Sequence, residues 1–92
     1  MARKYLFQLY LSNRSFSNEK ICENLKLVLD EKLKDQYSLE IIYFTEDVEL
    51  VLQRSIFTTP TLVKKLPSPS STVVGDLSDR EKLSVAVEIS LK

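Results

Sequence analysis

The sequence predicts a single α/β domain whose strands and helices follow in the order βαβαββα. Three observations support this fold class. The first half of the chain reads as strand, helix and strand, the pattern of a parallel βαβ unit. In the second half, a proline heads an apolar run, and a Pro/Ser loop separates that run from a β-branched one. A helix-start signal then precedes the C-terminal residues. Residues 1–92 are enough for one core.

The predicted first strand, residues 4–11, carries apolar side chains on both of its faces. Such a strand is typical of the centre of a sheet that is covered on both sides. Ser17 or Asn18 can cap the following helix, which should continue to about Lys34. Residues 39–44 form the predicted second strand, parallel to the first. The inward stripe of the helix recurs at helical spacing and comprises Ile21, Cys22, Leu25, Val28, Leu29 and Leu33.

The second half begins with a short predicted helix over residues 46–55. A strand over 61–66 follows Pro60, and residues 67–71 form a turn rich in proline and serine. A short strand over 72–74 should then pair antiparallel with the strand before it. The helical spacing within 46–55 directs three apolar side chains inward: Val48, Val51 and Leu52.

The last segment reads in two ways. Ser78 and Glu81 match a capping box, in which each side chain bonds the backbone N–H of the other residue, so a final helix should start there. The resulting order is that of the thioredoxin-like fold. Within residues 84–91, however, β-branched and polar residues alternate strictly, which favours a strand. A helical face is also present, formed by Leu83, Ala86, Val87, Ser90 and Leu91.

Composition narrows the function classes. Lys plus Arg equals Asp plus Glu at 13 each, so no net charge attracts the chain to nucleic acid or to an anionic membrane. No apolar run is long enough to span a bilayer, and the amino terminus lacks a cleavage site for a signal peptide. The absence of histidine and the single thiol, Cys22, predict no metal site and no internal disulfide. We therefore expect a cytoplasmic protein with no cofactor.

The chain also lacks the residues that catalysis on this fold would use. Thioredoxins place a cysteine of low pKa at the start of the helix after the first strand. The equivalent loop here, residues 12–17, has no cysteine, and Cys22 falls on the apolar stripe inside the helix. Without histidine, no Ser/His/Asp triad can form. These observations predict that the protein is not an enzyme.

The Thr59–Pro60 bond precedes the third predicted strand, where thioredoxin-like folds carry a cis-proline. That analogy, rather than spacing, favours the cis isomer, because trans predominates at X-Pro bonds in general. A cis-proline here exposes backbone groups to an extended peptide or to glutathione. A glutathione-binding enzyme that uses Ser15 or Ser17 is therefore one alternative, although helix capping explains both serines.

Three motifs at fixed spacing carry a family resemblance. They are TPTL at residues 59–62, a K-x-LP turn at 64–67 and GDLSDREK at 75–82, where Gly75 is the only glycine. Together they resemble the KaiB family of circadian-clock proteins, and the similarity extends over nearly the whole chain. The resemblance implies a non-catalytic module that binds the N-terminal ATPase ring of a KaiC-like hexamer and modulates its phosphorylation state. It also implies other clock proteins as partners and a dimer or tetramer of the chain itself.

A second reading of the same likeness is a sensor domain of the kind found in the clock-linked histidine kinase SasA. That domain shares the thioredoxin-like fold and the target.

KaiB-like proteins are also known to switch folds. The resemblance implies that residues 1–45 are constant, while residues 46–92 exchange the βαβαββα order for βαββααβ. A tail that reads as either helix or strand is what such a switch requires. Family members carry glycine where Ala86 stands here. Because alanine favours a helix over glycine by roughly 1 kcal/mol, we expect Ala86 to bias this chain towards the thioredoxin-like state.

Other positions depart from the family and indicate a divergent paralogue. Glu40 replaces a common lysine on a strand that approaches the partner, and Ser71-Thr72 replace an arginine pair. Tyr37 and Lys64 do match the family, and the resemblance makes them candidates for the partner surface. Structural roles are expected for a further set: Thr59, Pro60, Gly75, Ser78, Glu81 and Ala86.

Overall fold

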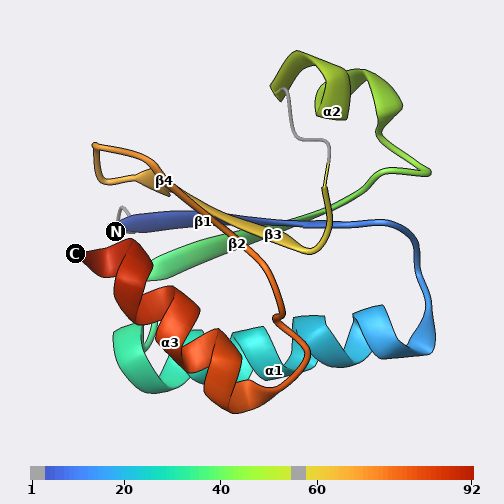
Figure 1. The fold of residues 1–92 in the computed structure, drawn as a ribbon. Coiled ribbons are helices and arrows are strands. Elements are labelled where there is room, and N and C mark those ends of the chain that lie inside the picture. The colour runs from blue at the N-terminus through green and yellow to red at the C-terminus, as the bar shows by residue number, and fades with distance from the viewer. Residues whose placement is uncertain (1–3, 55–57) are drawn as a thin grey trace.

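The computed structural model describes residues 4–54 and 58–92, without the side chain of Arg54, and confirms the predicted α/β class and element order. Ser55, the last residue of the predicted short helix, lies outside the described residues. Figure 1 shows the elements in chain order: β1 (Tyr5–Leu11), α1 (Phe16–Leu33), β2 (Tyr37–Tyr43), α2 (Val48–Arg54), β3 (Thr61–Leu66), β4 (Ser71–Val74) and α3 (Arg80–Leu91).

The four strands form one mixed sheet in the order β2-β1-β3-β4. β1 pairs parallel with β2 and antiparallel with β3, and β4 pairs antiparallel with β3. The register places Leu9 opposite Ile41 on one side and Leu62 on the other. The prediction of a central first strand is confirmed, and β2 and β4 are the edge strands.

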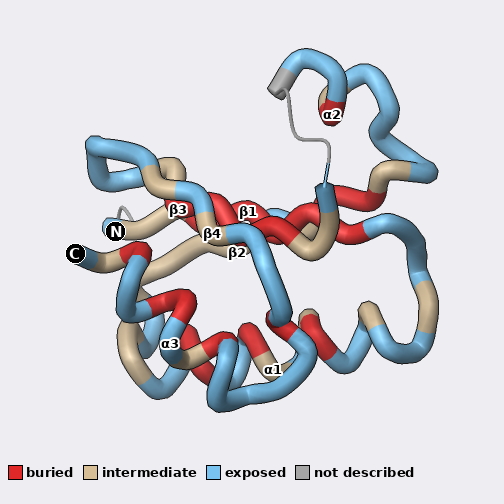
Figure 2. The backbone as a smooth tube through the Cα atoms, viewed as in Figure 1, coloured by how far each residue is buried: buried red, intermediate tan, exposed pale blue. Residues whose placement is uncertain are grey.

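Helices cover both faces of the sheet, but unequally. α1 and α3 lie side by side on one face, and α2 alone lies over the other (Figure 1). The backbone coloured by burial shows the buried segments of β1, α1 and α3 facing one another (Figure 2). The cluster on that face comprises Phe7, Leu9, Leu11, Ile21, Leu25, Val28, Leu29, Tyr43, Leu62, Leu77, Leu83, Ala86 and Val87. The cluster on the α2 face comprises Tyr10, Ile42, Val51 and Val63.

Helix α1 begins two or three residues earlier than its predicted caps indicate. Ser15, rather than Ser17 or Asn18, is the N-cap, and its Oγ accepts a hydrogen bond from the backbone N–H of Asn18 at 3.2 Å. The Asn18 side chain instead turns back to donate to the carbonyl oxygen of Asn13 at 2.9 Å. An asparagine whose amide bonds the preceding loop fits inside the first helical turn, which is why the pattern alone misplaced the cap.

The ambiguous tail is helical, because α3 runs from Arg80 to Leu91. Its N-cap is Asp79, whose Oδ1 accepts from the backbone N–H of Lys82 at 2.8 Å. The predicted capping box of Ser78 and Glu81 is therefore wrong by one position. The backbone N–H of Ser78 donates to Asp76 Oδ1 at 3.0 Å, outside the helix. A carboxylate cap serves better than a hydroxyl here, because its charge faces the positive end of the helix.

The start of β2 and the inward face of α2 also differ from the prediction. β2 starts at Tyr37, two residues before the predicted 39–44 strand. In α2, Val51 is buried as predicted, but Val48 and Leu52 are wrongly assigned to the inward face, because they are 55% and 62% exposed. The partly buried neighbour of Val51 is Leu50, which packs against the same cluster. The inward face of this short helix is thus rotated by one residue from the predicted one.

Cis-prolines and a positive-φ glycine occur in the segments before, between and after β3 and β4. The Thr59–Pro60 peptide bond is cis, and Thr61 Oγ1 donates to the carbonyl oxygen of Thr58 at 2.7 Å, next to it. The Leu66–Pro67 and Ser68–Pro69 bonds in the β3–β4 turn are cis as well. Gly75, which follows β4, has a φ of 146°. Residues other than glycine rarely adopt this backbone conformation.

Candidate functional site

The loop between β1 and α1 occupies the place where a thioredoxin would hold its reactive cysteine, and it holds none. Cys22 lies inside α1, half-buried, with Sγ 3.9 Å from Tyr43 Oη. Burial raises the pKa of the Cys22 thiol, which keeps it protonated and unreactive near neutral pH. The geometry therefore does not support thiol–disulfide exchange at this position.

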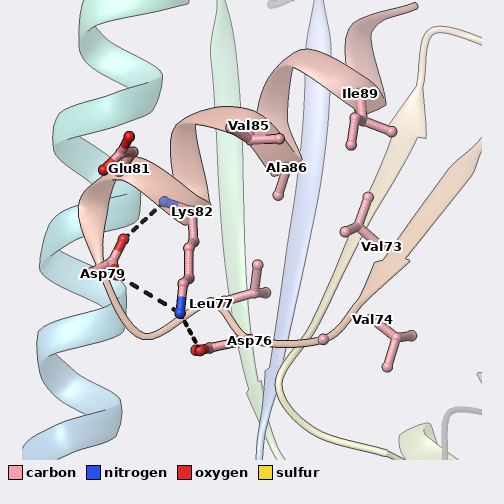
Figure 3. Close-up of a pocket in the computed structure, with 11 residues that line it drawn as sticks. Val73, Val74, Asp76, Leu77, Asp79, Glu81, Lys82, Val85, Ala86 and Ile89 are labelled. Carbon is pink, nitrogen blue, oxygen red and sulfur yellow. Dashed lines mark hydrogen bonds and ion pairs between the residues drawn. The ribbon is translucent and has the colours of Figure 1, made fainter.

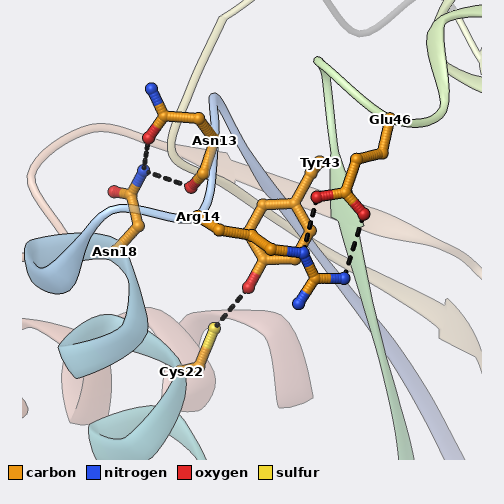
Figure 4. A network of polar contacts seen from close by, with 6 residues as sticks. All are labelled: Asn13, Arg14, Asn18, Cys22, Tyr43 and Glu46. Carbon is orange, nitrogen blue, oxygen red and sulfur yellow. Dashed lines mark hydrogen bonds and ion pairs between the residues drawn. The ribbon is translucent and has the colours of Figure 1, made fainter.

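Arg14, Tyr43 and Glu46 contact one another at the end of the sheet next to the loop after β1 (Figure 4). Arg14 donates to both carboxylate oxygens of Glu46, at 2.5 and 3.0 Å, and its guanidinium lies 4.5 Å from the centre of the Tyr43 ring. The hydrogen bond from Arg14 lowers the pKa of Glu46. These contacts link the loop after β1 to the turn after β2. Because both partners are solvent-exposed, we expect them to orient the loop more than they stabilise the fold.

The two serines that a glutathione enzyme would use both belong to the start of α1. Ser15 Oγ caps the helix and lies 3.2 Å from Ser17 Oγ. The contacts described for these two hydroxyls are within the start of the helix, and none of them marks a place for a ligand. Pro60 has the cis bond expected of the fold. A cis-proline by itself identifies no substrate.

Tyr37 and Glu40 lie on β2, one of the two edges of the sheet. Tyr37 is half-buried, and its Oη donates to Asp30 Oδ1 at 2.5 Å, which fixes the ring against α1. Glu40 is exposed, and its Oε1 accepts from Gln8 Nε2 at 2.7 Å. Gln8 Oε1 in turn accepts from Tyr10 Oη at 2.9 Å. A polar chain thus runs from the buried centre of the sheet to the Glu40 carboxylate.

This chain of hydrogen bonds was not predicted from the sequence. Its one visible signal was Gln8, a polar residue within a strand that otherwise reads as buried on both faces. A buried amide requires hydrogen-bond partners, so Gln8 could have been assigned neighbours on the adjoining strand. Which neighbours they are depends on the parallel register, which pairs Gln8 with Glu40.

Lys64, the second candidate for the partner surface, is not at the surface. It is 4% exposed and lies on β3 opposite Phe7 of β1 and Ser71 of β4. Since directly paired residues of antiparallel strands share a face, its side chain is on the face that α1 and α3 cover. β1 separates it from Tyr37. The structure therefore does not bring the two candidates together, and Lys64 does not belong to an exposed site in this fold.

The β2 edge has the properties of a binding surface. An edge strand presents unpaired backbone groups on which another chain can dock, and here hydrogen bonds hold two side chains in place along it. Across residues 4–54 and 58–92, the structure contains no cluster of three or more His, Cys, Asp or Glu residues that could hold a metal ion. No helix in the described part of the chain is long and apolar enough to cross a membrane.

Comparison with protein families and sequences agrees with the motifs. A family model described as the KaiB domain matches residues 8–89. The circadian clock oscillator protein KaiB of Microcystis aeruginosa is 32% identical over 87 residues, which cover 95% of this chain and 84% of that protein. The protein of the same name from Prochlorococcus marinus subsp. pastoris is 34% identical over 90 residues, covering 97% of this chain and 84% of the relative.

Comparison with solved structures confirms the thioredoxin-like fold. The N-terminal domain of SasA from Synechococcus elongatus superposes with a TM-score of 0.75 at 23% identity, covering 99% of this chain and 86% of that domain. The thioredoxin of Malassezia sympodialis superposes with a TM-score of 0.70 at 19% identity, covering 97% of this chain and 76% of the thioredoxin. At these identities the likeness concerns the fold alone.

Proposed function

Because the chain belongs to the KaiB family, we propose that it is a non-catalytic regulatory protein that binds the N-terminal ATPase ring of a KaiC-like hexamer and modulates its phosphorylation state. The observation that carries this proposal is the extent of the family match, which spans residues 8–89 and therefore almost every element of the fold. The relatives named above are circadian clock oscillator proteins, so the partner is sought among clock ATPases and the proteins that assemble on them.

The geometry supports binding rather than catalysis. The helix start that a redox enzyme would use carries no thiol, and the arginine–glutamate contact occupies the end of the sheet beside it. β2, in contrast, pairs with β1 alone among the described strands, and it carries Tyr37 and Glu40. Tyrosines held by a hydrogen bond are effective in interfaces, because their rings supply contact area at little cost in side-chain entropy. We assign the ATPase contact to this edge.

Complex formation tests the proposal directly. The chain is mixed with a purified KaiC-like hexamer and nucleotide, and the mixture is followed by size-exclusion chromatography with light scattering. A complex of ring size, with one copy of the chain per ATPase subunit, is the expected result. The phosphorylation state of the ATPase is followed in the same mixture. Elution of the chain alone at every nucleotide condition would overturn the proposal.

Substitutions at Tyr37 test the assigned edge separately from the function. Tyr37→Ala removes the ring and should weaken the complex about tenfold or more, as truncation of an interface tyrosine commonly does. Tyr37→Phe keeps the ring and removes only the bond to Asp30, so it should retain most of the affinity. Leu27→Ala, at an exposed position of α1, is the matched control and should bind like the unmodified chain. If Tyr37→Ala also binds fully, the function stands and the β2 edge is not the contact.

A further inference from the structure

A groove lies between β4 and α3 (Figure 3). β4 is at the opposite edge of the sheet from β2, the strand that carries Tyr37. Its volume is about 470 Å³, within the usual range for ligand sites. The groove is separate from the β2 edge and from the contact between Arg14 and Glu46. Its floor is formed by side chains of the main core or next to it: Val73, Leu77 and Ala86.

The walls of the groove carry exposed apolar side chains. Val74 from β4 and Val85 and Ile89 from α3 all line it, and they are 57%, 52% and 53% exposed. Val85 and Ile89 are one helical turn apart and lie on the same side of α3 as the groove (Figure 3). Isolated exposed apolar residues are ordinary, but three that line one hollow form a surface suited to an apolar partner.

β4 supplies a free backbone edge along this groove. Among the described residues it pairs only with β3, so the backbone groups on its other side have no strand partner. An extended peptide can add to such an edge, with main-chain hydrogen bonds giving affinity and alternate side chains entering the neighbouring hollow. The apolar walls therefore stand where the side chains of an added strand would lie.

One end of the groove is acidic. Asp76, Asp79 and Glu81 line it together with a single base, Lys82, whose ammonium pairs with Asp76. Three carboxylates against one ammonium leave two negative charges at neutral pH. The neighbouring Arg80 does not neutralise them, because its Nη2 lies 3.5 Å from Glu31 Oε2 on α1. The charge complementary to this end is a lysine or an arginine.

We propose that the β4–α3 groove binds an extended segment of a partner protein in which a basic residue precedes apolar ones, paired antiparallel with β4. The order follows from the chain direction. The acidic end comes after Val74 along the chain, so an antiparallel segment meets the acidic end first and the apolar walls afterwards. This groove and the β2 edge are at opposite sides of the sheet, so the proposal does not depend on the ATPase contact.

Peptides of matched composition test the proposal by NMR titration of the full chain at low salt. The probe is an acetylated, amidated peptide in which one lysine precedes three valines and a threonine. It should shift the methyl resonances of Val74, Val85 and Ile89 in a saturable manner. The same composition in reverse order, and a version with glutamate in place of lysine, should each bind roughly tenfold more weakly. Equal binding of all three peptides, or no methyl shift with any of them, would overturn the proposal.

Variants at exposed positions locate the binding on the protein. Val85→Thr and Ile89→Thr should weaken the lysine-first peptide, whereas Leu27→Thr, an exposed apolar residue on the other helix, should not. Glu81→Gln should reduce the preference for lysine over glutamate, and Glu23→Gln on α1 is its control. If the same methyl resonances shift on raising the protein concentration without peptide, a second copy of the chain covers the groove and the proposal fails.

Discussion

The two faces of the sheet differ in how much of the core they hold. Among the residues that the structure describes, thirteen buried ones form the cluster beneath α1 and α3, and four form the cluster beneath α2. Because apolar burial is the main source of folding free energy, the first face carries most of the stability. α2 packs on the second face mainly through Val51, and it exposes Val48 and Leu52 on its outer side. α2 is therefore the element that should open most readily without global unfolding.

The same comparison bears on the expected fold switch. Of the described residues in the cluster beneath α1 and α3, eight come from residues 1–45, and five come from the second half, namely Leu62, Leu77, Leu83, Ala86 and Val87. A half that supplies eight core residues can stay constant while the other repacks around it. A switch would have to break the contacts of those five residues and replace them with others of nearly equal free energy.

The largest effect is expected at the centre of the large cluster. Leu25→Ala removes a fully buried side chain of α1 and leaves a cavity between helix and sheet. We expect a loss of about 2–5 kcal/mol in the free energy of unfolding, measured by urea denaturation. Leu27→Ala, two residues away and half-exposed, should cost less than about 1 kcal/mol. Similar losses for both variants would show that this face is not the main source of stability.

A smaller effect on the same face comes from Ala86→Gly. Ala86 is buried in the middle of α3, where glycine loses helix propensity and one buried methyl group. The two terms together amount to roughly 2 kcal/mol. If Ala86 biases the chain towards the thioredoxin-like state, backbone chemical shifts of residues 84–91 should move from helical to more extended values in this variant. The unmodified chain should remain helical there, and extended shifts in it would contradict the hypothesis.

Shortening a side chain on the α2 face of the sheet should affect global stability less. Val51→Ala truncates the buried residue among the described side chains of α2, and we expect a loss of about 1 kcal/mol. Hydrogen exchange should show the consequence more clearly, because the amides of α2 should lose protection while those of α1 keep theirs. Leu52→Ala, at an exposed position of the same helix, is the control. Uniform loss of protection over both faces would mean that α2 opens only with the whole domain.

An element could be predicted from the sequence where its local pattern fits only one kind of secondary structure. Residues 4–11 are apolar on both faces, which only a central strand explains, and β1 is central. The tail over 84–91 fits both a period of two and a helical face, so local pattern could not decide it. Packing decides it instead, because helix formation buries Leu83, Ala86 and Val87 together.

The candidate site was harder to predict than the fold. A lysine is expected to be exposed, so nothing local to Lys64 reveals that β3 carries it beneath α3. Glu40 and Gln8 are 32 residues apart, and only the register of β1 against β2 joins them. The β4–α3 groove likewise depends on an edge strand and a helix that approach each other in space.

The cap of α3 provides a test at the boundary of the large face. Asp79→Ala removes the carboxylate that accepts from the Lys82 N–H, and helix caps of this kind contribute about 1 kcal/mol. Ser78→Ala is the matched comparison, because the capping box predicted from the sequence would make it the damaging change. Thermal denaturation should show the loss for the Asp79 variant alone. A loss of thermal stability in the Ser78→Ala variant alone would instead support the capping box of Ser78 and Glu81.

The smallest effect is a pH dependence that belongs to the exposed acidic end of the groove. Lys82 donates to Asp76 and holds the pKa of that carboxyl well below its ordinary value of 3.8. The unfolded chain therefore takes up a proton first as the pH falls. Stability from this contact is complete at neutral pH and declines as the pH drops below about 4. Because both side chains of this ion pair are exposed to solvent, the change should be slight and should fade at high salt.

Two variants isolate that contribution. Asp76→Asn removes the titrating carboxyl and should flatten the fall in stability between pH 5 and about pH 2. Lys82→Met should flatten it only in part, because the hydrogen bonds from Ser78 remain. Denaturation midpoints measured across that range, at low and high salt, supply the comparison. If Lys82→Met retains the full acid dependence, the carboxyl is held by the Ser78 bonds rather than by the ammonium.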